Sequence, residues 1–173
     1  MIPTEILSKE HKNILVAIDL LSQECDAMES GTELNKEFIE NAIFFIRNYA
    51  DKFHHAKEEE ILFKVLETDE IQEKMPCSPI RQMLHEHDMG RKLVKNMEEG
   101  IKENDKDKVV QNARSYCYLL KDHIHKEDDI LYPMADEALS PENQESMAKE
   151  FMKVEEEMKE IKEKCLSFLG EEE

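Results

Sequence analysis

Histidine and glutamate occur at helical spacing twice, in nearly the same sequence context. Residues 54–63 read HHAKEEEILF and residues 123–132 read HIHKEDDILY. In each copy a histidine is followed four residues later by a glutamate, and then by Ile-Leu and an aromatic residue. Spacing i, i+4 places the imidazole and the carboxylate on one face of a helix. Both groups are metal ligands, and a metal ion between them removes the cost of burying them together.

Two Glu-His pairs add to this pattern, at residues 10–11 and 86–87. They lie 76 residues apart, and the two histidine-glutamate copies lie 69 residues apart, so the chain reads as two helical hairpins of related pattern. Antiparallel hairpins bring one end of every helix to a shared level, where four inward histidines can converge. Facing helices of this kind can hold two metal ions with carboxylates bridging between them.

The apolar neighbours at helical spacing predict that His11, His87 and His123 face the core. A lone histidine on an apolar face is usually a hydrogen-bonded core residue, and an isolated HxxxE is often a weak surface pair. The metal site is therefore inferred from the ordered set of four histidines and two glutamates. His85 and His125 are flanked by charged residues, which places them toward solvent.

The adjacent residues His54 and His55 leave two choices, His54 with Glu58 or His55 with Glu59. Alignment of the two ILF/ILY ends pairs His54 with His123 and favours the first choice. The charged neighbours Asp51, Lys52 and Glu59 place His55 toward solvent.

Long amphipathic helices must position these side chains. The periodicity predicts helices over about residues 3–29, 33–68, 79–103 and 105–132, with Pro133 bending or ending the last one. We expect an all-α fold, an antiparallel up-down four-helix bundle over residues 1–138. A further amphipathic helix over residues 139–173 carries an apolar seam. This seam packs either on the bundle or at a homodimer contact.

Charge and composition exclude several functions. The 173 residues contain 23 Lys and Arg against 41 Asp and Glu, a net charge of −18. This balance repels phosphate backbones and anionic lipids, so we expect neither nucleic-acid nor membrane binding. The four scattered cysteines have no CxxC spacing and no signal peptide is apparent, which favours a reducing, cytoplasmic location; a role for the cysteines stays open.

Four ordered segments, EHKNIL, FHHAKEEEILF, MLHEHDMGRKLV and HIHKEDDILYPMAD, resemble the hemerythrin family, specifically the bacterial and archaeal hemerythrin-like (HHE) cation-binding domains. This resemblance implies a non-haem di-iron site in an up-down four-helix bundle, with two iron ions that are oxo- or hydroxo-bridged when oxidised. Carried onto matching positions, the metal ligands are His11, His54, Glu58, His87, His123 and Glu127.

One position departs from the oxygen-carrying members of that family. They resemble this pattern but place a histidine four residues before the ligand of the third helix, where this chain has Met83. A thioether is a poor ligand for iron, so the pattern predicts an open position for water or an exogenous ligand. In this respect the ligand pattern of this chain is more similar to that of the iron-sulfur-repair branch of the family. Tyr49 and Tyr116 either hydrogen-bond such a ligand or simply pack in the core.

The resemblance favours a di-iron protein that binds or senses a small ligand: oxygen, nitric oxide or peroxide. The alternative is a stress-response protein acting in iron-sulfur repair, peroxide or nitric oxide detoxification, or iron storage. A third class is an interaction protein with a structural metal. The sequence leaves open whether the protein is an enzyme.

Overall fold

A computed structural model describes residues 1–170, and within this range every regular element is a helix, which confirms the predicted all-α class. The last three residues of the expected C-terminal segment lie outside the described range. The elements are α1 (Pro3–Glu29), α2 (Lys36–Phe45), η1 (Ile46–His55), η2 (Glu58–Leu62), α3 (Phe63–Leu66), α4 (Asp69–Gln72), α5 (Ile80–Glu103), α6 (Lys106–Lys126), η3 (Glu127–Leu131), α7 (Tyr132–Ala138), α8 (Pro141–Glu157), α9 (Lys159–Leu166) and η4 (Ser167–Leu169). The first three η elements are π-helical and the last is a 3₁₀ turn.

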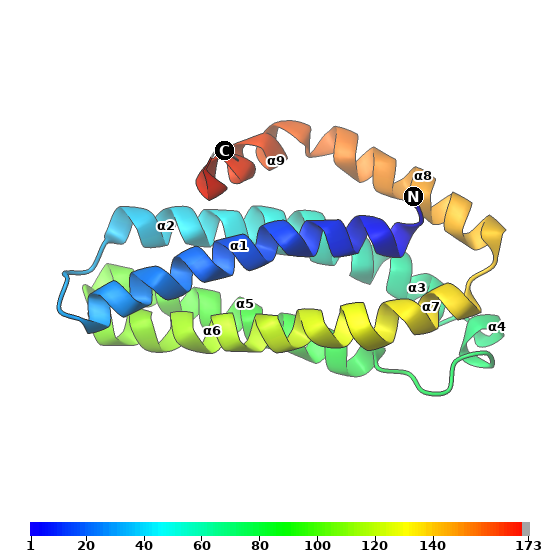
Figure 1. Ribbon diagram of the computed structural model, residues 1–173, viewed down its shortest axis with the longest axis horizontal. Helices are drawn as coiled ribbons and strands as arrows, with labels where there is room; N and C mark the ends of the chain where they lie inside the picture. Colours follow the sequence, from blue (N-terminus) through cyan, green and yellow to red (C-terminus); the bar gives the residue numbers. More distant parts are fainter. Residues whose placement is uncertain (171–173) are drawn as a thin grey trace.

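Four long helical segments lie side by side along the length of the molecule (Figure 1). The first segment is α1, and the second runs from α2 through η1 and η2 to α3. The third is α5, and the fourth runs from α6 through η3 to α7. Each segment crosses the molecule in the direction opposite to the one before it, so the middle of every segment reaches the same level.

Local sequence signals set the ends of these segments. Asn35 caps α2 by accepting a hydrogen bond from the Phe38 amide, and Asp105 caps α6 in the same way. Ser140 and Asn143 form a capping box at the start of α8. Asn104 ends α5 in the left-handed conformation, which asparagine tolerates well.

The second segment does not remain α-helical along its length. Within it the backbone is π-helical over Ile46–His55 and again over Glu58–Leu62. A π-helix bonds residue i to i+5 and has a wider turn than an α-helix, so neighbouring side chains differ less in direction. The fourth segment has the same feature at Glu127–Leu131, and its helical backbone continues through Pro133 to Ala138.

Two apolar clusters occupy the interior, one on either side of a polar layer. The first includes Ile14 and Phe45, and the second includes Leu7 and Phe63. His11 belongs to the polar layer, because it lies one turn from Leu7 and one turn from Ile14 on α1. Apolar packing therefore encloses the polar layer from both ends.

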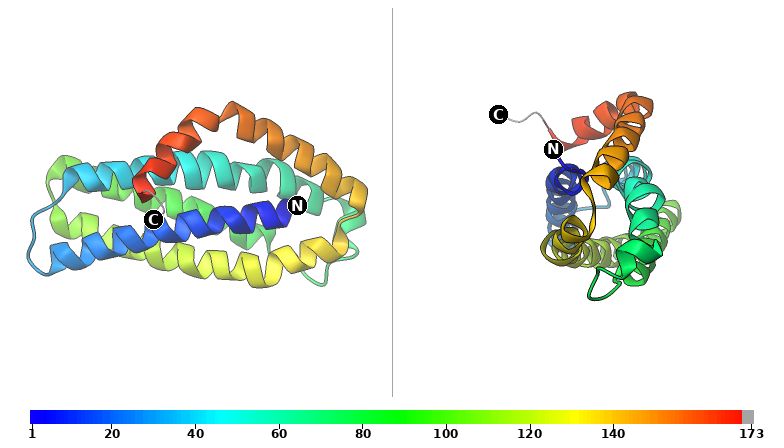
Figure 2. Two further views of the ribbon diagram at one scale, coloured as in Figure 1. Left: turned by 45° about the horizontal axis from the view of Figure 1, so that its top comes forward. Right: turned by 90° about the vertical axis from the view of Figure 1, so that its right-hand side faces the viewer.

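The C-terminal helices α8 and α9 lie across the outside of the first and second segments (Figure 2). Phe151 is buried in the second cluster and Cys165 in the first, so most of the predicted apolar seam packs within the chain. Ile161, also on the seam, is 41% exposed. The homodimer contact stays a prediction. Among the described residues, no helix has both the length and the apolar character needed to span a membrane.

Substitution of Phe151 tests this packing. Phe151→Ala should lower the free energy of unfolding by about 3–5 kcal/mol, because it leaves a cavity in a packed cluster. The neighbouring Met152 is 69% exposed, so Met152→Ala should change stability by less than about 0.5 kcal/mol. Urea unfolding followed by circular dichroism measures both. Equal effects would contradict the packing of α8 on the other helices.

Candidate metal centre

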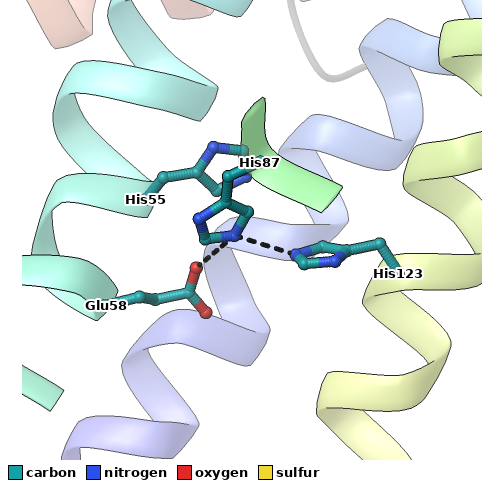
Figure 3. Close-up of side chains that lie close together, drawn as sticks. All are labelled: His55, Glu58, His87 and His123. Atoms are coloured by element: carbon teal, nitrogen blue, oxygen red, sulfur yellow. Dashed lines mark hydrogen bonds and ion pairs between the residues drawn. The ribbon is translucent and has the colours of Figure 1, made fainter. Parts of the chain in front are cut away.

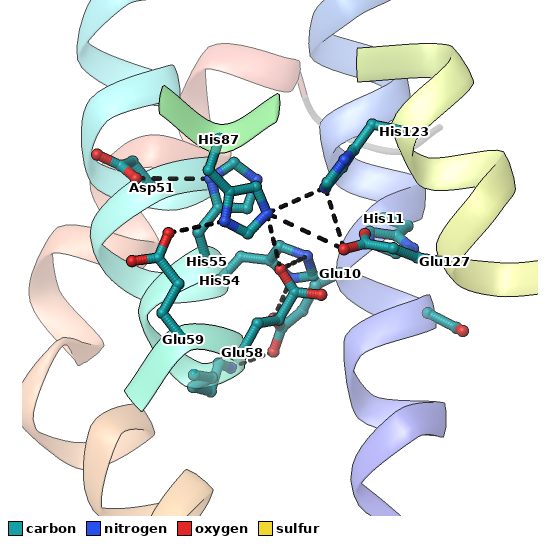
Figure 4. Close-up of polar contacts among 12 residues, drawn as sticks. Glu10, His11, Asp51, His54, His55, Glu58, Glu59, His87, His123 and Glu127 are labelled. Carbon is teal, nitrogen blue, oxygen red and sulfur yellow. Dashed lines mark hydrogen bonds and ion pairs between the residues drawn. The ribbon is translucent and has the colours of Figure 1, made fainter. Parts of the chain in front are cut away.

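Seven side chains converge in the polar layer from all four segments (Figure 4). They are buried histidines and glutamates, none more than 6% exposed: His11, His54, His55, Glu58, His87, His123 and Glu127. All six residues predicted as ligands are therefore brought together at one level of the fold. The seventh, His55, was not among them.

These side chains form two groups, in each of which the potential ligand atoms lie within 4.8 Å of one another. The three-histidine group contains His55, Glu58, His87 and His123 (Figure 3). The two-histidine group contains His11, His54, Glu58 and Glu127.

Two carboxylates connect the groups. Glu58 belongs to both. Glu127 reaches across as well, because its Oε1 lies 3.0 Å from His123 Nε2 and its Oε2 lies 3.2 Å from His11 Nε2. Both glutamates therefore lie between the two groups, the position in which the sequence analysis expects bridging carboxylates.

The prediction that His55 faces solvent is wrong. Its side chain is buried, and its ring stacks on that of His87 with 3.8 Å between centroids. The wide π-helical turn explains this, because it lets the adjacent residues His54 and His55 both point inward. A sequence signal was available: Ile124, the residue aligned with His55 in the second copy, is also buried. His85 and His125 are exposed, as predicted.

A carboxylate lies beside the Nδ1 atom of every inward histidine. In four pairs the distance is 2.7–2.9 Å, and in the fifth it is 3.5 Å: His11 with Asp128, His54 with Glu10, His87 with Glu59, His123 with Glu86, and His55 with Asp51. A carboxylate at Nδ1 assigns the proton to that atom and leaves the Nε2 lone pair facing the centre. Metal-binding histidines have this arrangement in many proteins.

Cationic side chains hold these outer carboxylates in turn. Lys57 binds Glu10 and Lys126 binds Glu86. Arg91 donates to both Glu59 (2.7 Å) and Asp51 (2.8 Å). Lys57 is fully buried, with its ammonium 3.6 Å from the centroid of the Phe53 ring.

Four of the outer carboxylates occupy matching positions in the two hairpins, and this repetition is visible in the sequence. Each Glu-His pair contributes a glutamate that contacts the histidine of the next segment along the chain. The acidic residue after each inward glutamate, Glu59 or Asp128, contacts a histidine of the other hairpin. All four contacts join residues of different segments, so spacing along one helix could not reveal them.

Tyr132 also contacts the centre, although its place in the Ile-Leu-aromatic pattern gave no indication of this. Its hydroxyl donates to Glu58 Oε1 at 2.5 Å, and its ring stacks on His11. At the equivalent position of the first copy, Phe63 stacks on His87 without a hydroxyl. Tyr49 lies farther along the core and accepts a hydrogen bond from Asn13.

Unpartnered atoms show that these residues fit a metal ion. Glu58 Oε2 and both carboxylate oxygens of Glu127 are buried without a hydrogen-bond partner in the described part of the chain. His87 Nε2 and His123 Nε2 lie only 3.0 Å apart, although both Nδ1 atoms donate to carboxylates. Two facing lone pairs at this distance repel unless a proton or a metal ion lies between them, and imidazole with carboxylate is a donor set suited to iron.

The electrostatic environment also stabilises positive charge at the centre. Burial opposes protonation of His11, but the neighbouring carboxylates of Asp128 and Glu127 outweigh it and raise the pKa of His11 to about 9. Burial likewise opposes protonation of His123, yet the charge of Glu127 prevails and its pKa rises to about 10. His55 is different, because burial and the charge of His87 lower its pKa to about 4.

Comparison with known families gives one match. The family described as Hemerythrin HHE cation binding domain matches residues 2–135, a range that contains all seven side chains of the centre. No curated protein and no solved structure gives a significant match to this chain. The matched range is well over half of the 173 residues, and its histidine and glutamate groups fit a metal site. The chain is thus a metal-binding member of the hemerythrin HHE cation-binding domain family.

Proposed function

We propose that this protein is a non-haem di-iron protein that binds or senses a small diatomic or peroxide ligand. The observation that carries this proposal is the pair of histidine groups joined by Glu58 and Glu127, with three buried carboxylate oxygens lacking partners. We further propose that residues 1–138 form an antiparallel four-helix bundle and that the C-terminal helices cover one side of it.

The proposed ligand set is larger than the six residues that the resemblance implies. His55, His87 and His123 would hold one iron, His11 and His54 would hold the other, and Glu58 and Glu127 would be shared between them. Met83 lies buried in the second apolar cluster, where the oxygen carriers have a histidine. The wide turn of η1 supplies the fifth imidazole from a different segment.

Iron bound here would supply a redox-active centre able to coordinate a small molecule. The chain's own groups do the rest. The outer carboxylates orient the imidazole rings, and the two apolar clusters exclude bulk water from the ligands. The Tyr132 hydroxyl donates its proton in a hydrogen bond to Oε1 of Glu58, the carboxylate that belongs to both groups.

No observation favours the alternative repair role over ligand binding. Burial raises the pKa of Cys25 to about 11 and that of Cys117 to about 12, which makes these thiols poor nucleophiles. Neither is part of the two histidine groups. A role in peroxide or nitric oxide detoxification uses the same centre and would appear as turnover when peroxide or nitric oxide is added to the iron-loaded protein. The cytoplasmic location stays a proposal based on the scattered cysteines.

Iron stoichiometry tests the bridging glutamates. The wild-type protein should bind two iron ions per chain, and Glu127→Ala or Glu58→Ala should lose at least one of them, because each substitution removes a ligand shared by both ions. Glu60→Ala is the matched control, since Glu60 is exposed and pairs only with Lys64. Iron analysis after anaerobic loading gives the ratio, and circular dichroism checks folding. Full iron content in both bridging variants would refute the assignment.

A second experiment tests His55 as a ligand. His55→Ala should leave one tight and one weakened site in a ferrous iron titration, because the three-histidine group loses an imidazole. His125→Ala should behave as the wild type, since His125 is exposed and contacts Asp129. Thermal unfolding gives an independent reading: iron at 100 times its dissociation constant stabilises by about 2.7 kcal/mol per site. An unchanged titration of His55→Ala would restrict the centre to the six residues named from the sequence.

A further inference from the structure

A cavity of about 80 Å³ adjoins the three-histidine group of the metal centre. It lies between η1, α5 and α6. Its inner end is formed by His55, His87 and His123, the imidazoles of the three-histidine group (Figure 3). Its volume is several times the roughly 10–15 Å³ that one water-sized probe occupies, so a diatomic molecule has room in it.

Most of the wall surface of this cavity is apolar and comes from Ile46, Val94, Tyr116, Leu119 and Leu120. The charged residues Arg47, Asp51, Glu86 and Arg91 also line it. An anion entering such a space would lose its hydration without compensation, whereas a small neutral molecule would not. The wall therefore favours neutral ligands.

The arginines that line the cavity are already neutralised. Arg47 forms two hydrogen bonds with Glu98, and Arg91 pairs with Asp51 and Glu59. Both arginines are partly exposed, which places them toward the solvent side of the cavity. Because their charges are paired, they do not form an anion-binding site.

Gly90 keeps part of the wall open. It lines the cavity within α5, where glycine is an unfavourable helix residue. A Cβ atom added there would lie 3.5 Å from Cε2 of Tyr116, an ordinary contact, so alanine fits the backbone and narrows the cavity. This places Tyr116 in the cavity wall; its packing against Gly90 gives it a role that the sequence left open.

At the inner end, His55 is the least constrained ring. Its Nδ1 lies 3.5 Å from Asp51, whereas the other four histidines are 2.7–2.9 Å from their carboxylates. The contact of His55 with its outer carboxylate is therefore the longest of the five.

A second hollow, a groove of about 440 Å³, lies on the opposite side beside α1 and α7. It is lined mainly by polar and charged residues, including Lys12, Asp128 and Asp136. It touches none of the seven side chains of the centre, although Asp128 and Tyr132, which contact His11, line it. The apolar cavity touches three of the seven directly. The cavity is the more direct approach to the metal centre.

We propose that this cavity is the port through which a small neutral ligand reaches the centre, with Gly90 and Leu119 setting its width and His55, His87 and His123 at its inner end. This inference rests on the proposed di-iron function. It assigns the ligand class, small and uncharged, and the side of the molecule from which the ligand enters.

Nitric oxide is the probe for the test. Its binding to the reduced, iron-loaded protein is followed by stopped-flow absorbance. Gly90→Ala should slow binding severalfold by narrowing the cavity, and Leu119→Ala should accelerate it by widening the partly exposed end. Met89→Ala is the matched control, because Met89 is exposed on the same helix and lies outside the cavity. Azide is an anion that probes the oxidised protein, and its rates of binding to these variants should not follow this order.

The controls separate this inference from the function on which it rests. If the wild type binds no iron, or binds iron but does not react with nitric oxide, the proposed function fails. If iron content and nitric oxide binding are normal but the rates of all three variants equal that of the wild type, the port is refuted and the function stands. The port is also refuted if nitric oxide binding is slowed by Lys12→Trp, a substitution in the groove, and not by Gly90→Ala. An equal response of azide would overturn the assignment to neutral ligands.

Discussion

The structure depends on one electrostatic constraint, the burial of two carboxylates and five imidazoles in the middle of an apolar interior. Such groups are tolerated only when charge and hydrogen bonding are balanced at short range. Here the balance is built outward in alternating layers. The inner glutamates face imidazole Nε2 atoms, each Nδ1 faces an outer carboxylate, and most of those carboxylates face a lysine or arginine. The net charge of −18 is therefore not spread evenly, since cations are concentrated directly behind the centre.

The two hairpins depend on each other because their contacts are exchanged. Asp128 of the fourth segment fixes His11 of the first, and Glu59 of the second fixes His87 of the third. Neither hairpin can therefore complete its own half of the centre. The two copies differ at two of these positions: His55 in the first copy aligns with Ile124 in the second, and Phe63 aligns with Tyr132. These differences make the two histidine groups chemically unequal.

The sequence predicted the helical class, the four long segments and six of the seven inward ligand candidates, because their signals are local and periodic. His54 and Glu58 followed from i, i+4 spacing together with the aligned repeat. His55 could not be placed correctly, since the inference assumed an α-helix with about 100° between neighbours, and the backbone here is π-helical. Asp51 and Glu59 suggested a solvent-facing position for His55, yet they are the carboxylates that hold His55 and His87. The Tyr132 hydroxyl bond joins residues 74 positions apart, beyond the reach of any periodic pattern.

The π-helical turns also affect how the set of inward-facing residues can change during evolution. A wide turn accommodates one more residue than the α-helical turn that it replaces. Loss of a single residue between Ile46 and Phe53 would restore ordinary helical geometry and leave the segment long enough to span the molecule. It would also rotate the residues on either side of the deletion relative to each other, so that His54 and His55 could no longer both face inward with the upstream core in register. Insertions and deletions of single residues, and not only substitutions, are thus a route by which a chain of this kind gains or loses a metal ligand.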